Sequence, residues 1–102
     1  MPQTPLLTED ELTEALSAPG GPRWQLSDGV LVKTVVCEGF PQALTFVGQV
    51  GRLAEERDHH PDIDIRYNRV ILALSTHDSG GITRLDVELA RAIDALESPE
   101  AD

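Results

Sequence analysis

The sequence lacks several features that would assign it to a large class of proteins. With a single cysteine, Cys37, it can form no internal disulfide, which is typical of a reducing compartment. No apolar run approaches the ~20 residues that a membrane span needs. The first residues lack the basic start and apolar core of a signal peptide. We therefore expect a cytoplasmic protein with no membrane-spanning segment.

Basic residues are also scarce. The 102 residues include 8 lysines and arginines against 18 aspartates and glutamates, a formal net charge of −10. A nucleic-acid-binding surface needs a basic footprint, and an anionic membrane attracts basic segments. The composition therefore argues against both partners. With 40% hydrophobic and 25% charged residues, the chain is otherwise an ordinary globular sequence, long enough for one two-layer core.

Capping and turn signals divide the chain into helices and strands. Thr8-Glu9-Asp10-Glu11 matches a capping box at the start of a first helix. Asp28-Gly29, between two apolar runs, predicts a hairpin with a type I′ turn, and Asn68-Arg69 predicts a second hairpin turn. The expected elements are helices at about 9–18, 40–58 and 84–96, and strands at 24–27, 30–37, 63–67 and 70–75.

This element order, α-β-β-α-β-β-α, predicts an α+β fold. We expect a four-stranded antiparallel sheet with three helices packed on one face. No repeat, low-complexity block or linker divides the sequence, so residues 1–102 are expected to form a single domain with loose tails at about 1–7 and 98–102. Gly48 and Gly51 each cost the long helix about 1 kcal/mol relative to alanine. Two such costs suggest that this helix face packs closely on the sheet.

The three histidines lie at the ends of expected elements. His59 and His60 follow the long helix, and His77 follows the fourth strand. If both hairpins join one antiparallel sheet, the start of the third strand and the end of the fourth lie together, which would bring the imidazoles close. Near Glu55 and Asp86, the histidines would form a proton-transfer site that works around neutral pH.

Simpler explanations exist for the same residues. Histidines near a helix C-terminus are favoured by the helix dipole, and Glu55 could be one of several solvated acids on its helix. Asp86 stands three residues after Thr83, where a capping box needs an acid. Three histidines could also bind zinc, but their spacing fits no known zinc pattern, and adjacent histidines rarely both bind one metal ion.

A longer pattern carries a resemblance to a known family. The pattern consists of Glu55-x-x-x-His59-His60-Pro61, Tyr67, Leu74-Ser75-Thr76-His77, Gly81-Ile82-Thr83 and Asp86. Together with Trp24 before the first hairpin, it resembles the pterin-4a-carbinolamine dehydratase family from Thr8 to Leu96. The expected element order matches the fold of that family. One position departs from it, because Ile63 stands where many members have an aromatic residue.

The resemblance implies an enzyme, a hydro-lyase of the 4a-hydroxytetrahydrobiopterin dehydratase kind. Such an enzyme dehydrates 4a-hydroxytetrahydropterin to quinonoid dihydropterin and water by histidine general acid/base catalysis. The resemblance implies tetrahydrobiopterin recycling and a functional link to an aromatic amino acid hydroxylase. It implies no metal and no redox cofactor. Members of the family associate, so we expect a homodimer or a homotetramer.

The same resemblance implies the site residues. His59 and His77 are the candidates for acid and base, and His60 for positioning the pterin. Asp86 would orient His77 and also cap the last helix through its other oxygen. The residues expected to support or bind the substrate are Glu55, Pro61, Ser75 and Thr76, the last two through their backbone groups.

Two other functions stay open. One is a non-catalytic role on the same fold, as a transcription-factor partner or an assembly chaperone. Such proteins would be expected to lose part of the set of three histidines and an aspartate, which is complete here. The other is a pterin-related role in molybdopterin metabolism, and the neighbouring genes would distinguish it from pterin recycling.

Overall fold

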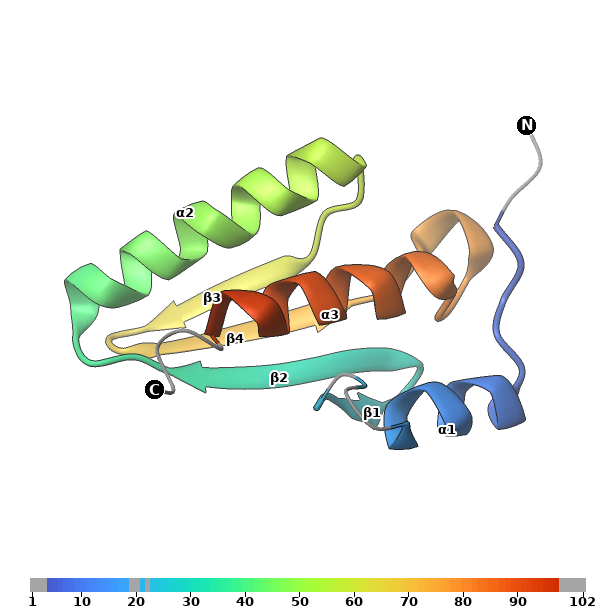
Figure 1. Ribbon diagram of the computed structural model, residues 1–102. Helices are drawn as coiled ribbons and strands as arrows, with labels where there is room; N and C mark the ends of the chain where they lie inside the picture. The colour runs from blue at the N-terminus through green and yellow to red at the C-terminus, as the bar shows by residue number, and fades with distance from the viewer. Residues whose placement is uncertain (1–3, 19–20, 22, 98–102) are drawn as a thin grey trace.

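The structure is a computed structural model that describes residues 4–18, 21 and 23–97. Its elements are α1 (Glu9–Ser17), β1 (Gln25–Ser27), β2 (Val30–Val36), α2 (Phe40–Arg57), β3 (Asp62–Arg66), β4 (Arg69–Leu74), the short 3-10 helix η1 (His77–Ser79) and α3 (Arg84–Glu97). The strands form one antiparallel sheet in the order β1-β2-β4-β3, with helices on one face (Figure 1). The expected α+β class and the element order are confirmed.

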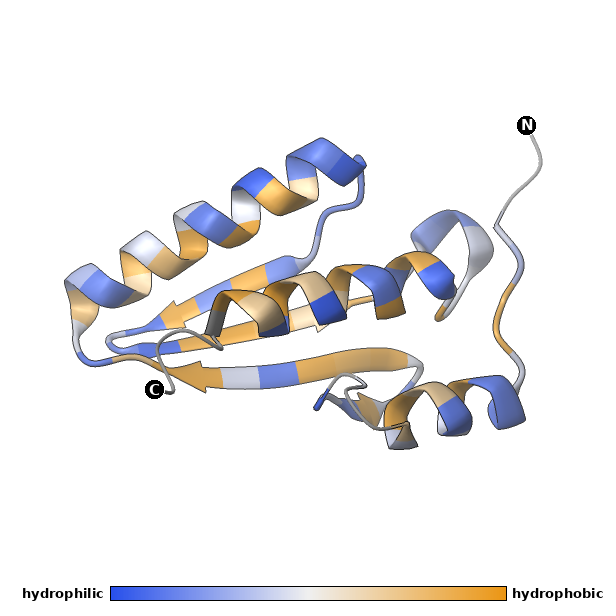
Figure 2. Cartoon of the chain, viewed as in Figure 1, coloured by the Kyte–Doolittle hydropathy of each residue, from blue (hydrophilic) through white to orange (hydrophobic). Residues whose placement is uncertain are grey.

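The core lies between the sheet and the two long helices. Successive side chains of a strand point to opposite faces, and directly paired residues share a face. In the central pair β2 and β4, Leu31 faces Leu74 and Val35 faces Val70, and all four are buried. Figure 2 shows apolar bands on α2 and α3 that alternate with polar ones, as expected for helices with one buried side. The buried hydrophobic residues on these helices are Ala43, Phe46, Val50, Ala54, Val87, Leu89, Ala90 and Ile93.

The glycines of α2 are not at a close packing contact. A Cβ atom added at Gly48 or Gly51 would meet nothing within 4 Å. The expectation that this face packs closely on the sheet is therefore wrong. The helix packs instead through the larger side chains of its buried stripe, which the glycines do not belong to.

The N-terminal segment is attached to the domain. Leu6 forms an isolated antiparallel bridge with Thr83, and the Leu7 N–H donates to the carbonyl of Ile82 at 2.9 Å. The Ser79 hydroxyl donates to the carbonyl of Thr4. The expectation of a loose tail is thus wrong for residues 4–7, because their backbone pairs with the segment before α3. The other expected loose residues, 1–3 and 98–102, lie outside the described residues.

The two hairpin turns differ in how well local sequence predicts them. Asp28 and Gly29 both have positive φ, 50° and 75°, so the expected turn of type I′ geometry is confirmed. In the second hairpin Arg66 pairs with Arg69, so the turn is one residue earlier than expected and Tyr67 has the positive φ of 56°. Asn68 has another role, since its side-chain amide donates to the carbonyl of Cys37 at 3.0 Å.

Asp94 of α3 fixes this helix to the edge of the sheet where β1 begins. Its Oδ1 atom accepts from the indole N–H of Trp24 at 2.9 Å and from the Lys33 ammonium at 2.8 Å. Trp24 is buried. These contacts hold α3, whose N-terminus carries the candidate site, in one position over the sheet. No helix within the described ranges is long and apolar enough to cross a membrane.

Candidate functional site

The end of α2 turns the chain so that His59 faces α3. Asp58 adopts the left-handed conformation (φ 49°, ψ 43°), and its N–H donates to the carbonyls of Ala54 and Glu55. The N–H of His59 then donates to the same Ala54 carbonyl at 3.1 Å, which closes the helix. Aspartate tolerates this backbone conformation better than most residues. The turn therefore sets the direction in which His59 leaves the helix.

The start of α3 supplies the carboxylate that His59 meets. The N–H of Leu85 donates to the Thr83 hydroxyl at 3.2 Å, and the N–H of Thr83 donates to Oδ2 of Asp86 at 2.9 Å. Thr83 thus caps α3 and Asp86 reaches back to it, as expected, although the hydroxyl accepts from the second helical N–H and not from the third, as in a full capping box. The cap holds the Asp86 side chain against the first turn of α3 and leaves its Oδ1 atom for another partner.

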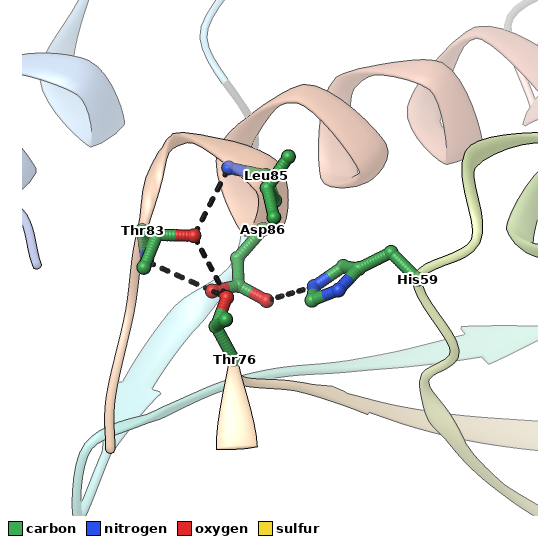
Figure 3. A network of polar contacts seen from close by, with 5 residues as sticks. All are labelled: His59, Thr76, Thr83, Leu85 and Asp86. Atoms are coloured by element: carbon green, nitrogen blue, oxygen red, sulfur yellow. Dashed lines mark hydrogen bonds and ion pairs between the residues drawn. The ribbon is translucent and has the colours of Figure 1, made fainter. Parts of the chain in front are cut away.

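That partner is His59. The Asp86 side chain has 0% exposure, and its Oδ1 atom lies 2.6 Å from Nε2 of His59, which is 11% exposed (Figure 3). A carboxylate only accepts hydrogen bonds, so Nε2 carries the hydrogen. The other ring nitrogen, Nδ1, then has the lone pair and can take up a proton. Asp86 therefore selects which nitrogen of His59 can act as a base.

The expected pairing of Asp86 with His77 is wrong. Thr76, one residue earlier, has an extended backbone (φ −102°, ψ 98°), and successive side chains of an extended segment point to opposite sides. The buried Thr76 side chain donates to Oδ2 of Asp86 at 2.8 Å, and His77 is exposed. Asp86 does serve an imidazole and a helix cap through different oxygens, but the imidazole is His59 and not the expected His77.

His60 forms a second, exposed pair. Its Nε2 atom lies 2.9 Å from Oε1 of Glu55, and the two side chains are 58% and 82% exposed. An exposed pair of this kind stabilises a protein by only about 0–1 kcal/mol. Glu55 thus contacts the histidine segment, as expected, but holds His60 far less firmly than Asp86 holds His59.

Hydrogen bonds to the backbone of Thr76 hold the loop after β4 together. The Thr76 N–H donates to the carbonyl of Gly81 at 2.8 Å, and the Thr76 carbonyl accepts from Ser79 and Gly80 at 3.0 and 2.9 Å. Gly80 closes the turn with a φ of 78°. The N–H of Thr76 is therefore not available to a substrate, contrary to expectation. The loop presents the exposed His77. Two other residues expected to contact the substrate, Ser75 before this loop and Pro61 before β3, are both half-buried.

Both histidine segments meet at the start of α3, as the antiparallel topology predicts. His59 precedes β3, Thr76 follows β4, and both contact Asp86 (Figure 3). Thr83 belongs to this network through a 2.7 Å contact between its hydroxyl and that of Thr76. Its role as the cap of α3 could be found from the sequence, but its contact with Thr76 could not. In the part of the chain that the structure describes, no group of three or more His, Cys, Asp and Glu residues could hold a metal ion.

The sequence matches one family model and many curated proteins. The model described as pterin 4 alpha carbinolamine dehydratase matches residues 5–96, which include every site residue above. A protein of Chloroflexus aurantiacus named "Putative pterin-4-alpha-carbinolamine dehydratase" is 51% identical over 92 residues, 90% of this chain and 97% of the relative. A protein of Sulfurisphaera tokodaii with the same name is 48% identical over 90 residues, 88% and 95% of the two chains.

Two solved structures are similar to this one. A "transcriptional coactivator/pterin dehydratase" from Brucella melitensis has a TM-score of 0.81 and 39% identity, over 89% of this chain and 97% of that chain. A "pterin dehydratase-like protein", identified as a RuBisCO assembly factor in the alpha-carboxysome, has a TM-score of 0.60 and 25% identity, over 74% and 88%. The fold is thus found in proteins whose names describe different roles.

Proposed function

The chain belongs to the pterin 4 alpha carbinolamine dehydratase family, and from this premise we propose that it converts 4a-hydroxytetrahydropterin to quinonoid dihydropterin and water. The family match and the names of the relatives support pterin carbinolamine dehydratase activity. One observation supports the histidine mechanism in particular. His59 is held through Nε2 by a buried carboxylate, beside the loop that carries His77.

The reaction needs two proton transfers and no change in oxidation state. The bond between C4a and its hydroxyl oxygen breaks, the N5–H proton leaves, and the electron pair of that N–H bond forms the C4a=N5 double bond. The departing hydroxide takes up a proton and becomes water. An acid and a base of the imidazole type, with a pKa of about 6.5, suit both steps near neutral pH, and each typically contributes about 10²–10⁴-fold.

We assign the base to His59 and the acid to His77. Nδ1 of His59 accepts the N5 proton, because Nε2 donates to Asp86. The Asp86 carboxylate then stabilises the imidazolium that forms. His77, exposed on the loop, donates to the departing hydroxyl. His60, with Glu55, positions the pterin ring at the rim of the site.

The flat pterin also needs neighbours that do not transfer protons. We assign Pro61 and Ser75, half-buried next to the two histidine segments, to contacts with its edge. The reaction balances with no metal and no redox cofactor. The substrate carries no phosphate, so a protein with a net charge of −10 meets no electrostatic penalty in binding it.

The setting of the reaction is part of the proposal. We place it in tetrahydrobiopterin recycling after an aromatic amino acid hydroxylase, in a reducing cytoplasm that suits a single-cysteine chain. A homodimer or homotetramer would cover exposed apolar side chains such as Phe40, Leu44 and Val36, which are 45%, 47% and 65% exposed. Analytical ultracentrifugation would measure the oligomeric state.

Stopped-flow dehydration of a synthetic 4a-carbinolamine by the purified protein tests the activity. We expect the wild-type protein to exceed the spontaneous rate by orders of magnitude, and His59→Ala and His77→Ala to lose most of that acceleration. Circular dichroism would show that both variants keep the fold. A wild-type rate equal to the spontaneous rate, or full activity in both variants, would contradict the proposal.

A second candidate is a non-catalytic assembly or coactivator role. It is favoured by the names of the two structural relatives, one a "transcriptional coactivator/pterin dehydratase" and the other a pterin dehydratase-like RuBisCO assembly factor. Such a role depends on a surface, so a His59→Ala/His77→Ala double variant would retain it. The neighbouring genes would discriminate among these roles, because a hydroxylase gene supports pterin recycling, whereas a molybdenum-cofactor cluster or carboxysome genes would not.

A further inference from the structure

Three hydroxyl and amide groups form one directed chain of hydrogen bonds that ends on Asp86. The Thr76 hydroxyl donates its single hydrogen to Oδ2 of Asp86 at 2.8 Å, so the 2.7 Å contact with Thr83 must have Thr83 as donor. The Thr83 hydroxyl in turn accepts from the Leu85 N–H at 3.2 Å. Figure 3 shows these groups on one side of the carboxylate and His59 on the other.

Two buried donors support the Oδ2 atom: the Thr76 hydroxyl at the end of this chain, and the N–H of Thr83 at 2.9 Å. Thr83 and Asp86 are 0% exposed and Thr76 is 8% exposed, so bulk water does not replace a lost donor. A carboxylate is planar, and the direction of one oxygen therefore sets the direction of the other. The donors that hold Oδ2 aim Oδ1 at Nε2 of His59, 2.6 Å away.

We propose that Thr76 is a positioning residue that fixes the orientation and the tautomer of His59 through Asp86. Its effect on catalysis rests on the proposed dehydration, whereas its effect on the tautomer does not. The backbone carbonyl of Thr76 also accepts from three N–H groups, and its N–H donates to one carbonyl, within the loop that presents His77. A single residue at the end of β4 thus orders both histidine segments, and it does so without touching the substrate.

Three variants separate the hydroxyl from the shape of the side chain. Thr76→Val keeps the volume and removes the donor, and Thr76→Ser keeps the donor. Thr34→Val makes the same chemical change at an exposed position of the same sheet, on the face opposite the buried Val35. Stopped-flow kinetics would measure kcat and KM for each, and ¹⁵N NMR of the imidazoles would report the tautomer of His59.

In Thr76→Val we expect kcat to fall about 10- to 100-fold with KM unchanged, as is usual when a residue that orients a functional histidine is lost. The ¹⁵N shifts of His59 should move from the form with hydrogen on Nε2 towards a mixture. Thr76→Ser should restore both the wild-type kcat and the wild-type ¹⁵N shifts of His59, and Thr34→Val should match the wild type in both measurements. Unchanged kcat and unchanged ¹⁵N shifts in a folded Thr76→Val protein would overturn the proposal, as would a Thr76→Ser protein as impaired as Thr76→Val.

The wild-type protein provides a test that does not depend on a variant folding. The proposal requires the Thr76 hydroxyl proton to exchange slowly with water, because the proton is buried and bound to Asp86. A hydroxyl resonance of Thr76 that persists in water supports it, and rapid exchange overturns it. If the wild type failed to dehydrate the carbinolamine, the proposed function would fail, and the tautomer and the exchange rate would still decide the role of Thr76.

Discussion

Nε2 of His59 lies 2.6 Å from Oδ1 of Asp86, although the two residues are 27 positions apart in the chain. The contact joins the segment between α2 and β3 to the first turn of α3, and the carboxylate that makes it has no exposure to solvent. A buried carboxylate that accepts from an imidazole both orients the ring and selects its tautomer. The consequences can be measured.

Replacing Asp86 by asparagine tests the pair most directly. The Asp86→Asn side chain keeps its shape, but its amide can donate to His59 and so favours the wrong tautomer. We expect kcat to fall by between about 10² and 10⁴, by analogy with other carboxylate-supported histidines. Asp64→Asn, an exposed acid of β3, is the matched control and should keep full activity. An Asp86→Asn enzyme as active as the control would remove Asp86 from the mechanism.

His60 is expected to act on binding rather than on the chemical step. It is exposed and its partner, Glu55, is exposed as well, so His60→Ala should change the free energy of unfolding by less than about 1 kcal/mol. We expect KM to rise and kcat to stay near the wild-type value in steady-state dehydration assays. Glu55→Gln should show the same pattern with a smaller effect. A large fall in kcat at constant KM would instead assign a proton transfer to His60.

The left-handed turn at Asp58 should be sensitive to side-chain shape. A β-branched residue is strained at a φ of 49°, so Asp58→Val should lower the free energy of unfolding by about 1–2 kcal/mol, whereas Asp58→Gly should equal or exceed the wild type. Urea denaturation would measure both. Because the turn directs His59, the activity of Asp58→Val should also fall. Equal stability of the two variants would show that this backbone conformation carries no strain.

Asp94 is expected to matter for stability and not for chemistry. Asp94→Ala removes the acceptor of the buried Trp24 indole and of Lys33, which should cost about 1–3 kcal/mol. The fluorescence of Trp24, the only tryptophan, would follow the unfolding. Glu14→Ala on the exposed side of α1 is the control and should change stability by less than about 0.5 kcal/mol. A loss no larger than that of the control would show that the Asp94 contacts are weak.

The features that could be predicted from the sequence are those that depend on neighbouring residues. Each helix cap, Thr8 with Glu11 and Thr83 with Asp86, involves residues only three positions apart; the first is a full capping box, and in the second Asp86 reaches back to Thr83 while the Thr83 hydroxyl accepts from Leu85. The turn at Asp28-Gly29 depends on the backbone freedom of its own two residues. The order of helices and strands follows from apolar spacing, which is also local.

The errors involve residues whose surroundings come from distant parts of the chain. The sequence predicts the left-handed conformation of the turn at Asn68, but Tyr67 has the positive φ, and the Asn68 amide donates to the carbonyl of Cys37. Leu6 was expected in a loose tail, but it pairs with Thr83. Such contacts form between segments that are brought together only when the sheet and its helices pack, so no local sequence pattern predicts them.

The site shows the same division. Spacing, residue type and the family resemblance single out the three histidines and Asp86 as candidates, and antiparallel pairing predicts that their segments lie at one end of the sheet. Which histidine meets the carboxylate depended on tertiary packing. The left-handed turn at Asp58 directs His59 inward, and the extended backbone of Thr76 points its own side chain to Asp86 and leaves His77 exposed. Side-chain direction depends on the backbone conformation of each segment and on how the segments pack, and sequence spacing determines neither.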